Sequence, residues 1–197
     1  YISMILQKNK KINIISQKTA EKKAIINRHI IDSAQIIDFI DLKSNTTTDL
    51  GSGGGLPGII IAIMLKNLKK NIKIHLYEKS YHKSHFLREV SKKLELKTEI
   101  FQKDIFEIKN LETGTIMSRA FKPMPVVLDL VYKNFSNYKN LIFFMGKNGR
   151  EVFKNSLRDW DLDYIEKKSL TSQDSFLLNI KNIKKKIKKN NKIIKKN

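Results

Sequence analysis

The stretch TDLGSGGGLPGIIIAI, from Thr48 to Ile63, contains five of the chain's eight glycines, all of them between Gly51 and Gly58. Such a cluster costs backbone entropy on folding, so it indicates a loop that something else approaches closely. The residues TDL predict the end of a strand before the loop. The residues from Pro57 onward predict a helix, because a helix tolerates proline in its first turn. The sequence therefore predicts a strand, a glycine-rich loop and a helix, an arrangement that binds ligands in α/β proteins.

The rest of the chain predicts an α/β fold. Residues 1–43 have apolar positions at helical spacing and predict a helical N-terminal cap, and residues 45–48 read as a polar connector. Beyond them strands alternate with helices, which predicts a mostly parallel, doubly wound sheet. The expected strands are 48–50, 72–78, 97–102, 115–121, 140–146, 162–169 and 175–182, and the expected helices are 57–68, 84–94, 123–135 and 149–160. We expect a single domain over 1–186, with its Rossmann-like core at 46–186, and a disordered Lys- and Asn-rich tail at 187–197.

The chain carries a formal net charge of +20. The last 17 residues contribute nine lysines and no acidic residue, which leaves +11 on residues 1–180. This balance favours a polyanionic partner, because each Lys or Arg placed on a phosphate releases condensed counterions. An AT-rich genome would also enrich a chain in Lys, Ile and Asn, so the charge alone does not establish nucleic-acid binding.

The chain has no cysteine, which excludes disulfides, thiolate metal sites and a cysteine nucleophile. The longest apolar run, residues 56–65, is too short and too broken by Pro and Gly to span a bilayer. No basic-then-apolar leader opens the chain. We therefore expect a cytoplasmic protein without a membrane partner.

Two classes of cofactor-binding protein fit the glycine loop. Gly53, Gly55 and Gly58 form G-x-G-x-x-G between a strand and a helix, and Glu78 follows 20 residues after Gly58 at the end of the next strand. This is the dinucleotide fingerprint, which predicts a nicotinamide-dependent oxidoreductase. The same residues, read from Asp49, also form the D-x-G-x-G-x-G loop of class I methyltransferases, which bind S-adenosylmethionine.

Physical chemistry separates the two cofactors only in part. A pyrophosphate must reach N–H groups at the helix N-terminus, where Pro57 lacks a donor and Leu56 fills space. S-adenosylmethionine has no phosphate. Asp49, at the strand end, is placed to influence the loop conformation and to attract the cationic amino acid part of this cofactor. Glu78 can accept hydrogen bonds from the ribose of either cofactor, so it does not discriminate between them.

The residue types in the chain narrow the choice of methyl acceptor. Methylation at C5 of a pyrimidine needs a cysteine, and adenine N6 methylation uses an Asn/Asp-Pro-Pro-aromatic stretch where this chain reads MSRAFKPMP. His82 and His85 predict an exposed helix face rather than a metal site. Guanine N7 has a free lone pair and no proton to lose, so alignment and desolvation can suffice for its methylation. The missing acid–base pair fits this acceptor, but it also fits a protein without activity.

Several motifs, in order along the chain, resemble the bacterial RsmG (GidB) family, which methylates guanine N7 in small-subunit ribosomal RNA. DLGSGGGLPGI resembles the family's D-x-G-[ST]-G-x-G-L-P-G-I, and the Leu-Pro-Gly continuation is far more specific than the glycines alone. The other motifs are NKKINIIS (9–16), RHIIDS (28–33), KSHFLREV (83–90), SRAF (118–121) and SFLLNIKNIKKK (175–186). The resemblance implies a class I S-adenosylmethionine-dependent methyltransferase, with a Rossmann-like sheet and an N-terminal helical cap.

The resemblance also implies roles for single residues. The expected cofactor-binding residues are Asp49, Gly51, Ser52, Gly53, Gly55, Leu56, Glu78, Asp104, Ile105, Phe106 and Arg119. The expected RNA-binding residues are Arg28, His29 and Lys147. No catalytic side chain and no metal is required, and Arg119 is the one catalytic candidate, as a donor fork for a carboxylate, a phosphate or a guanine edge. Alternatives are a surface salt bridge for Arg119, a helix-packing role for His29, and simple neutralisation of Arg28 by Asp32 four residues later.

The implied substrate is guanine 527 in the 530 loop, presented by 16S ribosomal RNA or the small ribosomal subunit to a monomeric enzyme. The chain departs from the family at three places: Lys8 replaces a Trp, Ile105-Phe106 replaces a pair that often includes Glu, and MGKNG has one residue more than the usual Lys-Gly strand end. A NAD(P)-dependent oxidoreductase and a non-catalytic RNA-binding protein remain open alternatives at this point.

Overall fold

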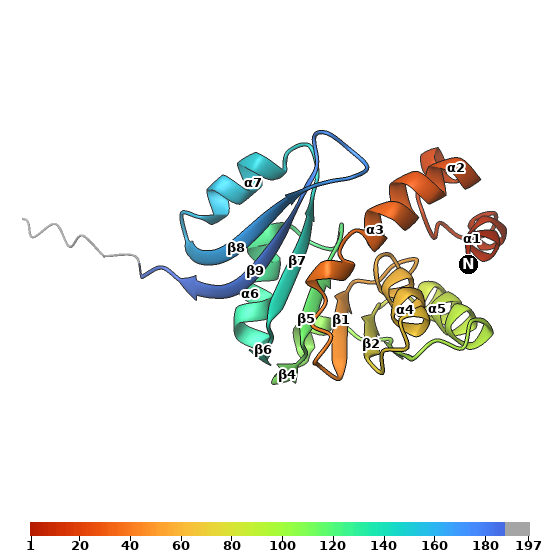
Figure 1. The fold of residues 1–197 in the computed structure, drawn as a ribbon, viewed down its shortest axis with the longest axis horizontal. Helices are drawn as coiled ribbons and strands as arrows, with labels where there is room; N and C mark the ends of the chain where they lie inside the picture. The colour runs from red at the N-terminus through yellow and green to blue at the C-terminus, as the bar shows by residue number, and fades with distance from the viewer. Residues whose placement is uncertain (188–197) are drawn as a thin grey trace, which may run out of the picture.

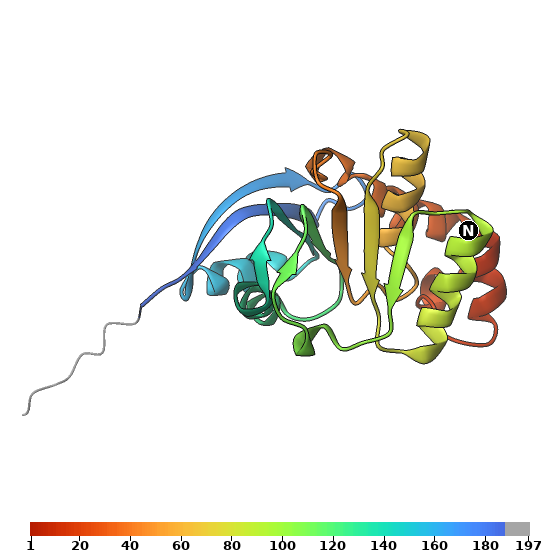
Figure 2. The ribbon, with the colours of Figure 1, turned by 90° about the horizontal axis from the view of Figure 1, so that it is seen from below.

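A computed structural model describes residues 1–187 and shows a seven-stranded, mostly parallel sheet in the order β3-β2-β1-β5-β7-β9-β8 (Figures 1 and 2). The first five strands of this order are parallel, whereas β9 pairs antiparallel with both β7 and β8. A two-stranded sheet, β4-β6, lies beside it. The strands are β1 Thr46–Leu50, β2 Lys73–Tyr77, β3 Thr98–Phe101, β4 Leu111–Glu112, β5 Thr115–Ser118, β6 Phe135–Asn137, β7 Asn140–Met145, β8 Trp160–Lys168 and β9 Phe176–Lys185.

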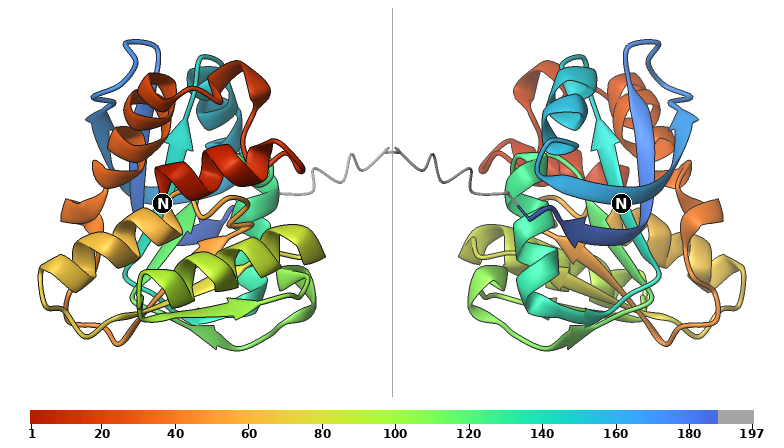
Figure 3. Two further views of the ribbon diagram at one scale, coloured as in Figure 1. Left: turned by 90° about the vertical axis from the view of Figure 1, so that its right-hand side faces the viewer. Right: turned by 90° about the vertical axis from the view of Figure 1, so that its left-hand side faces the viewer.

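Helices cover both faces of the sheet, so the predicted doubly wound arrangement is confirmed. Figure 3 shows α4, α5 and the N-terminal helices on one face and α6 and α7 on the other. The longer helices are α1 Ile2–Asn9, α4 Gly58–Asn67, α5 Tyr81–Lys93, α6 Met124–Asn134 and α7 Gly149–Ser156. Short turns complete the cap and one loop: η1 Gln17–Thr19, α2 Lys22–Ile25, the π-helical η2 Ile26–Ile31, α3 Asp32–Ala34, η3 Ile37–Phe39 and η4 Ile105–Glu107.

The hydrophobic core has two layers, one on each face of the sheet. The first layer joins the N-terminal helices to α4 and α5, and Ile5, Ile25 and Ile59 are fully buried in it. The second layer packs α6 and α7 against the sheet, and Trp160 is buried in it. The N-terminal helices therefore contribute to the same core as the α4 and α5 face of the sheet.

The sequence prediction was wrong at the start of the first strand. Residues 45–48 were expected to form a polar connector, but β1 begins at Thr46, and Thr47 and Thr48 are buried. β1 lies between β2 and β5 in the interior of the sheet, where both faces are covered. β-branched threonines suit such a strand despite their hydroxyls.

Several other boundaries also differ, two of them next to the glycine loop and the SRAF motif. The strand expected over 115–121 ends at Ser118, because Ala120 adopts a left-handed conformation with φ of 50° and turns the chain. The helix expected from Pro57 begins at Gly58, with Pro57 as its N-cap. The predicted disordered tail lies outside the described residues from 188 onward. Within residues 1–187, no helix has the length and apolar character needed to cross a membrane.

Candidate active site

A cavity of about 830 Å³ opens where β1, β2, β3 and β5 end. Its floor is the glycine loop after β1, and its walls come from the segments that follow the other three strands. The N-terminal cap supplies the remaining wall. The residues that line it fall in the segments 14–16, 51–56, 77–79, 103–106 and 119–123, together with His29, Lys83 and Val126. Parallel strands place their carboxyl ends at one edge of a sheet, which is the usual ligand edge of α/β folds.

The glycine loop has a backbone that only glycine fits at Gly51. Gly51 has a φ of +66°, and a Cβ there would lie 2.1 Å from Cδ2 of Phe121. Ser52 N donates to the carbonyl of Tyr77 at 2.9 Å, which ties the loop to the end of β2. The ring of Phe121, two residues after Arg119, therefore packs directly on the loop backbone.

Glu78 shapes the loop as well as lining the cavity. Its Oε2 accepts from Gly53 N at 2.9 Å, and its Oε1 accepts from Ser80 N at 2.8 Å. The side chain is largely buried but reaches the cavity. One carboxylate at the end of β2 thus holds both the glycine loop and the start of α5.

The N-terminus of α4 is closed to an anionic ligand. Gly58 N donates to Asp49 Oδ2 at 3.0 Å, and Ile59 N donates to the Gly55 carbonyl at 2.8 Å. Pro57, directly before Gly58, has no N–H. A pyrophosphate placed here would meet a buried carboxylate and no free donor from residues 57–59. This geometry disfavours a dinucleotide, and it shows that Asp49 contacts the start of the helix from beneath the loop.

Burial raises the pKa of Asp49 to about 7, from an ordinary value of 3.8, against the opposing effect of its hydrogen bond from Gly58. Between these two pH values the folded protein holds a proton that the unfolded chain has released. The free energy of unfolding contributed by this group therefore falls as pH rises from about 4 to about 7, and it is constant above that.

We predict that Asp49→Asn removes this pH dependence. Asparagine can accept from Gly58 N through its carbonyl but cannot ionise, so the variant should gain about 2 kcal/mol over the wild type between pH 5 and pH 8. Urea unfolding of both proteins at intervals of one pH unit measures the difference. His29 and His75 are present in both proteins, so their titration cancels in the difference between the two free energies of unfolding. Parallel stability curves for the two proteins would contradict the prediction.

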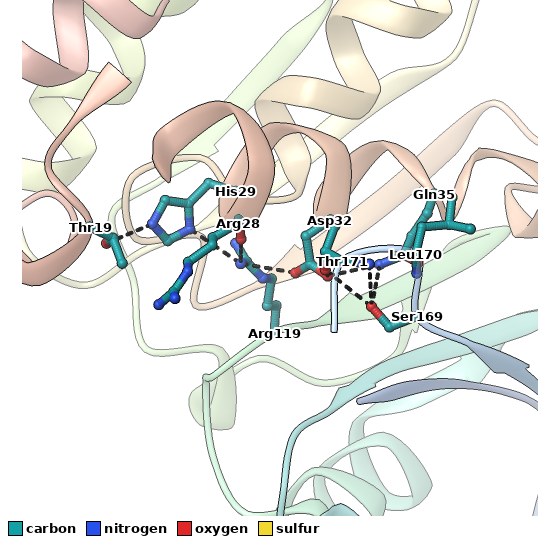
Figure 4. A network of polar contacts seen from close by, with 9 residues as sticks. All are labelled: Thr19, Arg28, His29, Asp32, Gln35, Arg119, Ser169, Leu170 and Thr171. Atoms are coloured by element: carbon teal, nitrogen blue, oxygen red, sulfur yellow. Dashed lines mark hydrogen bonds and ion pairs between the residues drawn. The ribbon is translucent and has the colours of Figure 1, made fainter. Parts of the chain in front are cut away.

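Arg119 is held by the N-terminal cap through a single nitrogen (Figure 4). Its Nη2 donates to the Arg28 carbonyl at 2.8 Å and to His29 Nδ1 at 3.3 Å, and it lies 3.0 Å from Asp32 Oδ2. Asp32 therefore pairs with Arg119 and not with Arg28, the alternative that the sequence left open. A guanidinium binds a two-oxygen group through a pair of nitrogens, either Nη1 with Nη2 or Nε with Nη2. Because Nη2 of Arg119 already contacts the cap, Arg119 can offer a ligand only Nη1 or Nε, one at a time.

Asp32 connects three segments that are far apart in the sequence. Its Oδ1 accepts from Gln35 Nε2 at 2.8 Å and from Thr171 Oγ1 at 2.9 Å, while Oδ2 faces Arg119. Gln35 Oε1 in turn accepts from Leu170 N at 2.9 Å. The cap, the segment after β5 and the loop between β8 and β9 thus meet at one carboxylate (Figure 4).

The structure brings most of the predicted site residues together. Those that line the cavity are His29, Gly51, Ser52, Gly53, Leu56, Glu78, Asp104, Ile105, Phe106 and Arg119. Asp49 and Gly55 are buried and do not line the cavity, while Arg28 and Lys147 are exposed and lie outside it. Sequence reasoning missed Ile14 and Phe121 as cavity residues, although both stand inside motifs quoted for the family resemblance. Among residues 1–187, no group of three or more His, Asp or Glu is arranged to hold a metal ion.

Comparison with protein-family models gives a match over residues 1–186 to GidB, described as rRNA small subunit methyltransferase G. The chain is 64% identical over 186 residues to the ribosomal RNA small subunit methyltransferase G of Pelagibacter ubique, covering 94% of this chain and 87% of that protein. It is 28% identical over 181 residues to the protein of the same name from Paracoccus denitrificans, covering 91% of each.

Solved structures share the fold at low sequence identity. A magnesium protoporphyrin IX methyltransferase from Synechocystis with bound S-adenosylmethionine has a TM-score of 0.62 at 9% identity, over 92% of this chain and 97% of that one. A mutant of MtNAS in complex with S-adenosylmethionine has a TM-score of 0.59 at 13% identity, over 91% of this chain and 72% of that one.

Proposed function

Because the chain belongs to the ribosomal RNA small subunit methyltransferase G family, we propose that it methylates N7 of a guanine in 16S ribosomal RNA, at guanine 527 of the 530 loop. The family resemblance, the class I methyltransferase fold and S-adenosylmethionine as cofactor are confirmed. The N7 position, the target nucleotide, a monomeric state and action in the cytoplasm belong to the proposal.

The cavity fits S-adenosylmethionine. Its volume of about 830 Å³ lies within the range of small-molecule sites, and Gly51, Ser52 and Gly53 of the loop line it. Glu78 would face the ribose, and Ile105 and Phe106 would border the adenine. When bound, S-adenosylmethionine supplies a methyl group on a positively charged sulfur. The protein's residues orient the two reactants and exclude water between them.

The observation that carries the choice of N7 is that carboxylates and imidazoles at the cavity are already hydrogen-bonded to the protein. Both oxygens of Glu78 accept backbone N–H groups, and both nitrogens of His29 have partners. Asp104 accepts from Phe106 N through Oδ1 alone, at 3.2 Å. A methyl acceptor that must lose a proton would need a free base here. Guanine N7 needs none, because its lone pair is available in the plane of the neutral base.

Methyl transfer from labelled S-adenosylmethionine to ribosomal RNA that lacks this modification tests the proposal. We expect label in 7-methylguanosine from 16S ribosomal RNA, at guanine 527, and none in 23S ribosomal RNA from the same preparation. Label in another nucleoside would refute the N7 assignment. Binding of the RNA without any incorporation would leave the non-catalytic alternative.

Four lysines at the cavity mouth are placed to hold the RNA backbone. They come from the segments after β2, β3 and β5, and none makes an ion pair within residues 1–187: Lys79, Lys83, Lys103 and Lys122. Phosphate contacts of this kind position a nucleic acid without reading its sequence. They also make its binding depend on salt, because each contact releases counterions.

We predict that the double variant Lys79→Gln/Lys122→Gln raises the KM for RNA about tenfold at moderate salt. The slope of log KM against log salt should fall by about 1.4, since each single-strand phosphate contact contributes about 0.7. Steady-state kinetics at four salt concentrations measures both quantities. The control is Lys43→Gln/Lys70→Gln, which removes two exposed lysines near the opposite edge of the sheet. Equal effects from both double variants would show that only net charge matters.

A further inference from the structure

His29 has a hydrogen-bond partner on each ring nitrogen, and the partners fix which nitrogen carries the proton. Nδ1 lies 3.3 Å from Arg119 Nη2, and Nε2 lies 2.9 Å from Thr19 Oγ1 (Figure 4). A guanidinium can only donate, so Nδ1 must be the acceptor. The neutral ring therefore carries its hydrogen on Nε2 and donates it to Thr19.

The hydrogen bonds continue in the same direction beyond the ring. Thr19 Oγ1 donates to the Ser16 carbonyl at 3.1 Å. Arg119, His29, Thr19 and Ser16 thus form one chain of three hydrogen bonds, which we call the Arg119–Ser16 chain. The His29 ring and the Thr19 hydroxyl each accept one hydrogen bond and donate another, so the chain has a single consistent polarity.

The two ends of the Arg119–Ser16 chain lie on different walls of the cavity. Arg119 follows β5, whereas Ser16 belongs to the cap wall with Ile14 and Ile15. Ile14 packs on the glycine loop, because its Cγ2 lies 2.7 Å from where a Cβ on Gly54 would be. His29 therefore joins the wall after β5 to the wall that touches the loop.

The charged groups around His29 favour its neutral form. Burial and then the guanidinium of Arg119 lower the pKa of His29, Asp32 opposes them with a smaller effect, and Arg28 adds the smallest lowering effect. A proton on Nδ1 would also face Arg119 Nη2 donor to donor. Protonation would therefore break the link to Arg119.

We propose that His29 is a positioning residue, held as the neutral Nε2–H tautomer, which fixes the cap wall at residues 14–16 against Arg119 and so shapes the cofactor cavity. The proposal rests on the proposed function in one respect only: the ligand used to test it is S-adenosylhomocysteine, the product left when S-adenosylmethionine has given up its methyl group. It gives His29 a role in the cofactor cavity, in addition to the RNA contact that the family resemblance implies.

The tautomer can be tested without any ligand. In protein labelled with ¹⁵N at histidine, the signals that disappear from long-range ¹⁵N–¹H spectra in His29→Asn belong to His29, and at pH 7 they should show a neutral ring with its proton on Nε2. The chain has four histidines, so this variant makes the assignment. A His29 that is protonated at pH 7, or that carries its proton on Nδ1, would overturn the proposal.

The positioning role can be tested at Thr19, which does not line the cavity. Thr19→Val should raise the Kd for S-adenosylhomocysteine, measured by calorimetry, about fivefold, and Thr19→Ser should restore wild-type affinity. Thr98→Val is the matched control, since it removes a Thr–Ser side-chain hydrogen bond between β3 and α5. In a His29→Asn background, Thr19→Val should change the Kd less than twofold, because the same link is already broken.

The outcomes separate the two hypotheses. If S-adenosylhomocysteine does not bind the wild-type protein, the proposed function fails, while the tautomer measurement still decides whether the hydrogen-bond chain exists. If it binds, and Thr19→Val weakens binding no more than Thr98→Val, the positioning role is wrong. Independent, additive effects of Thr19→Val and His29→Asn would also refute it.

Discussion

Gly51→Ala is expected to raise the Kd for S-adenosylhomocysteine at least 100-fold and to lower the free energy of unfolding by about 2 kcal/mol. A residue with a Cβ is strained by about 1–2 kcal/mol at a left-handed φ, and Gly51 has a φ of +66°. The new Cβ would also lie 2.1 Å from the ring of Phe121. The ring must move, and because it lines the cavity, the ligand loses part of its site. Calorimetry and urea unfolding measure the two effects.

Gly53→Ala is the matched control for Gly51→Ala. Gly53 also has a left-handed φ, +56°, but a Cβ there would meet only the Gly51 carbonyl oxygen at 3.8 Å. The control therefore has the backbone strain without the clash and should lose only about 1 kcal/mol of stability. In the double variant Gly51→Ala/Phe121→Leu, the smaller side chain should recover part of the lost stability. Equal effects of Gly51→Ala and Gly53→Ala would show that the contact with Phe121 is unimportant.

The sequence predicted the order of the elements well, because that order depends on local patterns. Alternating apolar strands and amphipathic helices identify an α/β sheet, and the glycine loop marks its ligand edge. The error at Thr46–Thr48 has a physical cause. Three consecutive threonines read as polar in isolation, and only the position of β1 between β2 and β5 shows why Thr47 and Thr48 are buried.

The site was harder to predict, because its contacts join residues far apart in the chain. The spacing of Glu78 from the glycine loop indicated a shared site, and the structure adds the bond to Gly53 N. No local pattern predicts that Asp32 pairs with Arg119, 87 positions later, or that Thr171 joins them. The direction of a side chain was also beyond the sequence: Asp49 stands in the motif, yet its carboxylate faces the start of α4.

Arg119→Ala is expected to lower kcat/KM for ribosomal RNA methylation about 100-fold. The guanidinium lines the cavity, and its Nη1 and Nε have no hydrogen bond within residues 1–187, so they can serve a ligand. Arg119→Lys should recover little of this loss, because an ammonium cannot bind the Arg28 carbonyl and His29 while also presenting a planar group to the cavity. Unchanged activity in Arg119→Ala would show that the assigned role is wrong.

A second variant separates lost activity from lost stability. Arg119→Ala leaves the carboxylate of Asp32, of which only 16% is exposed, without its cation, and the unpaired charge should destabilise the fold by about 1–2 kcal/mol. Asp32→Asn in the same background removes that charge while an amide oxygen can still accept from Thr171 and Gln35. Arg119→Ala/Asp32→Asn should therefore regain most of the melting temperature and none of the activity. A direct contact of Arg119 with cofactor or RNA predicts that kcat/KM stays low even after the unpaired charge of Asp32 has been removed. If activity returned together with stability, Arg119 would serve the fold alone.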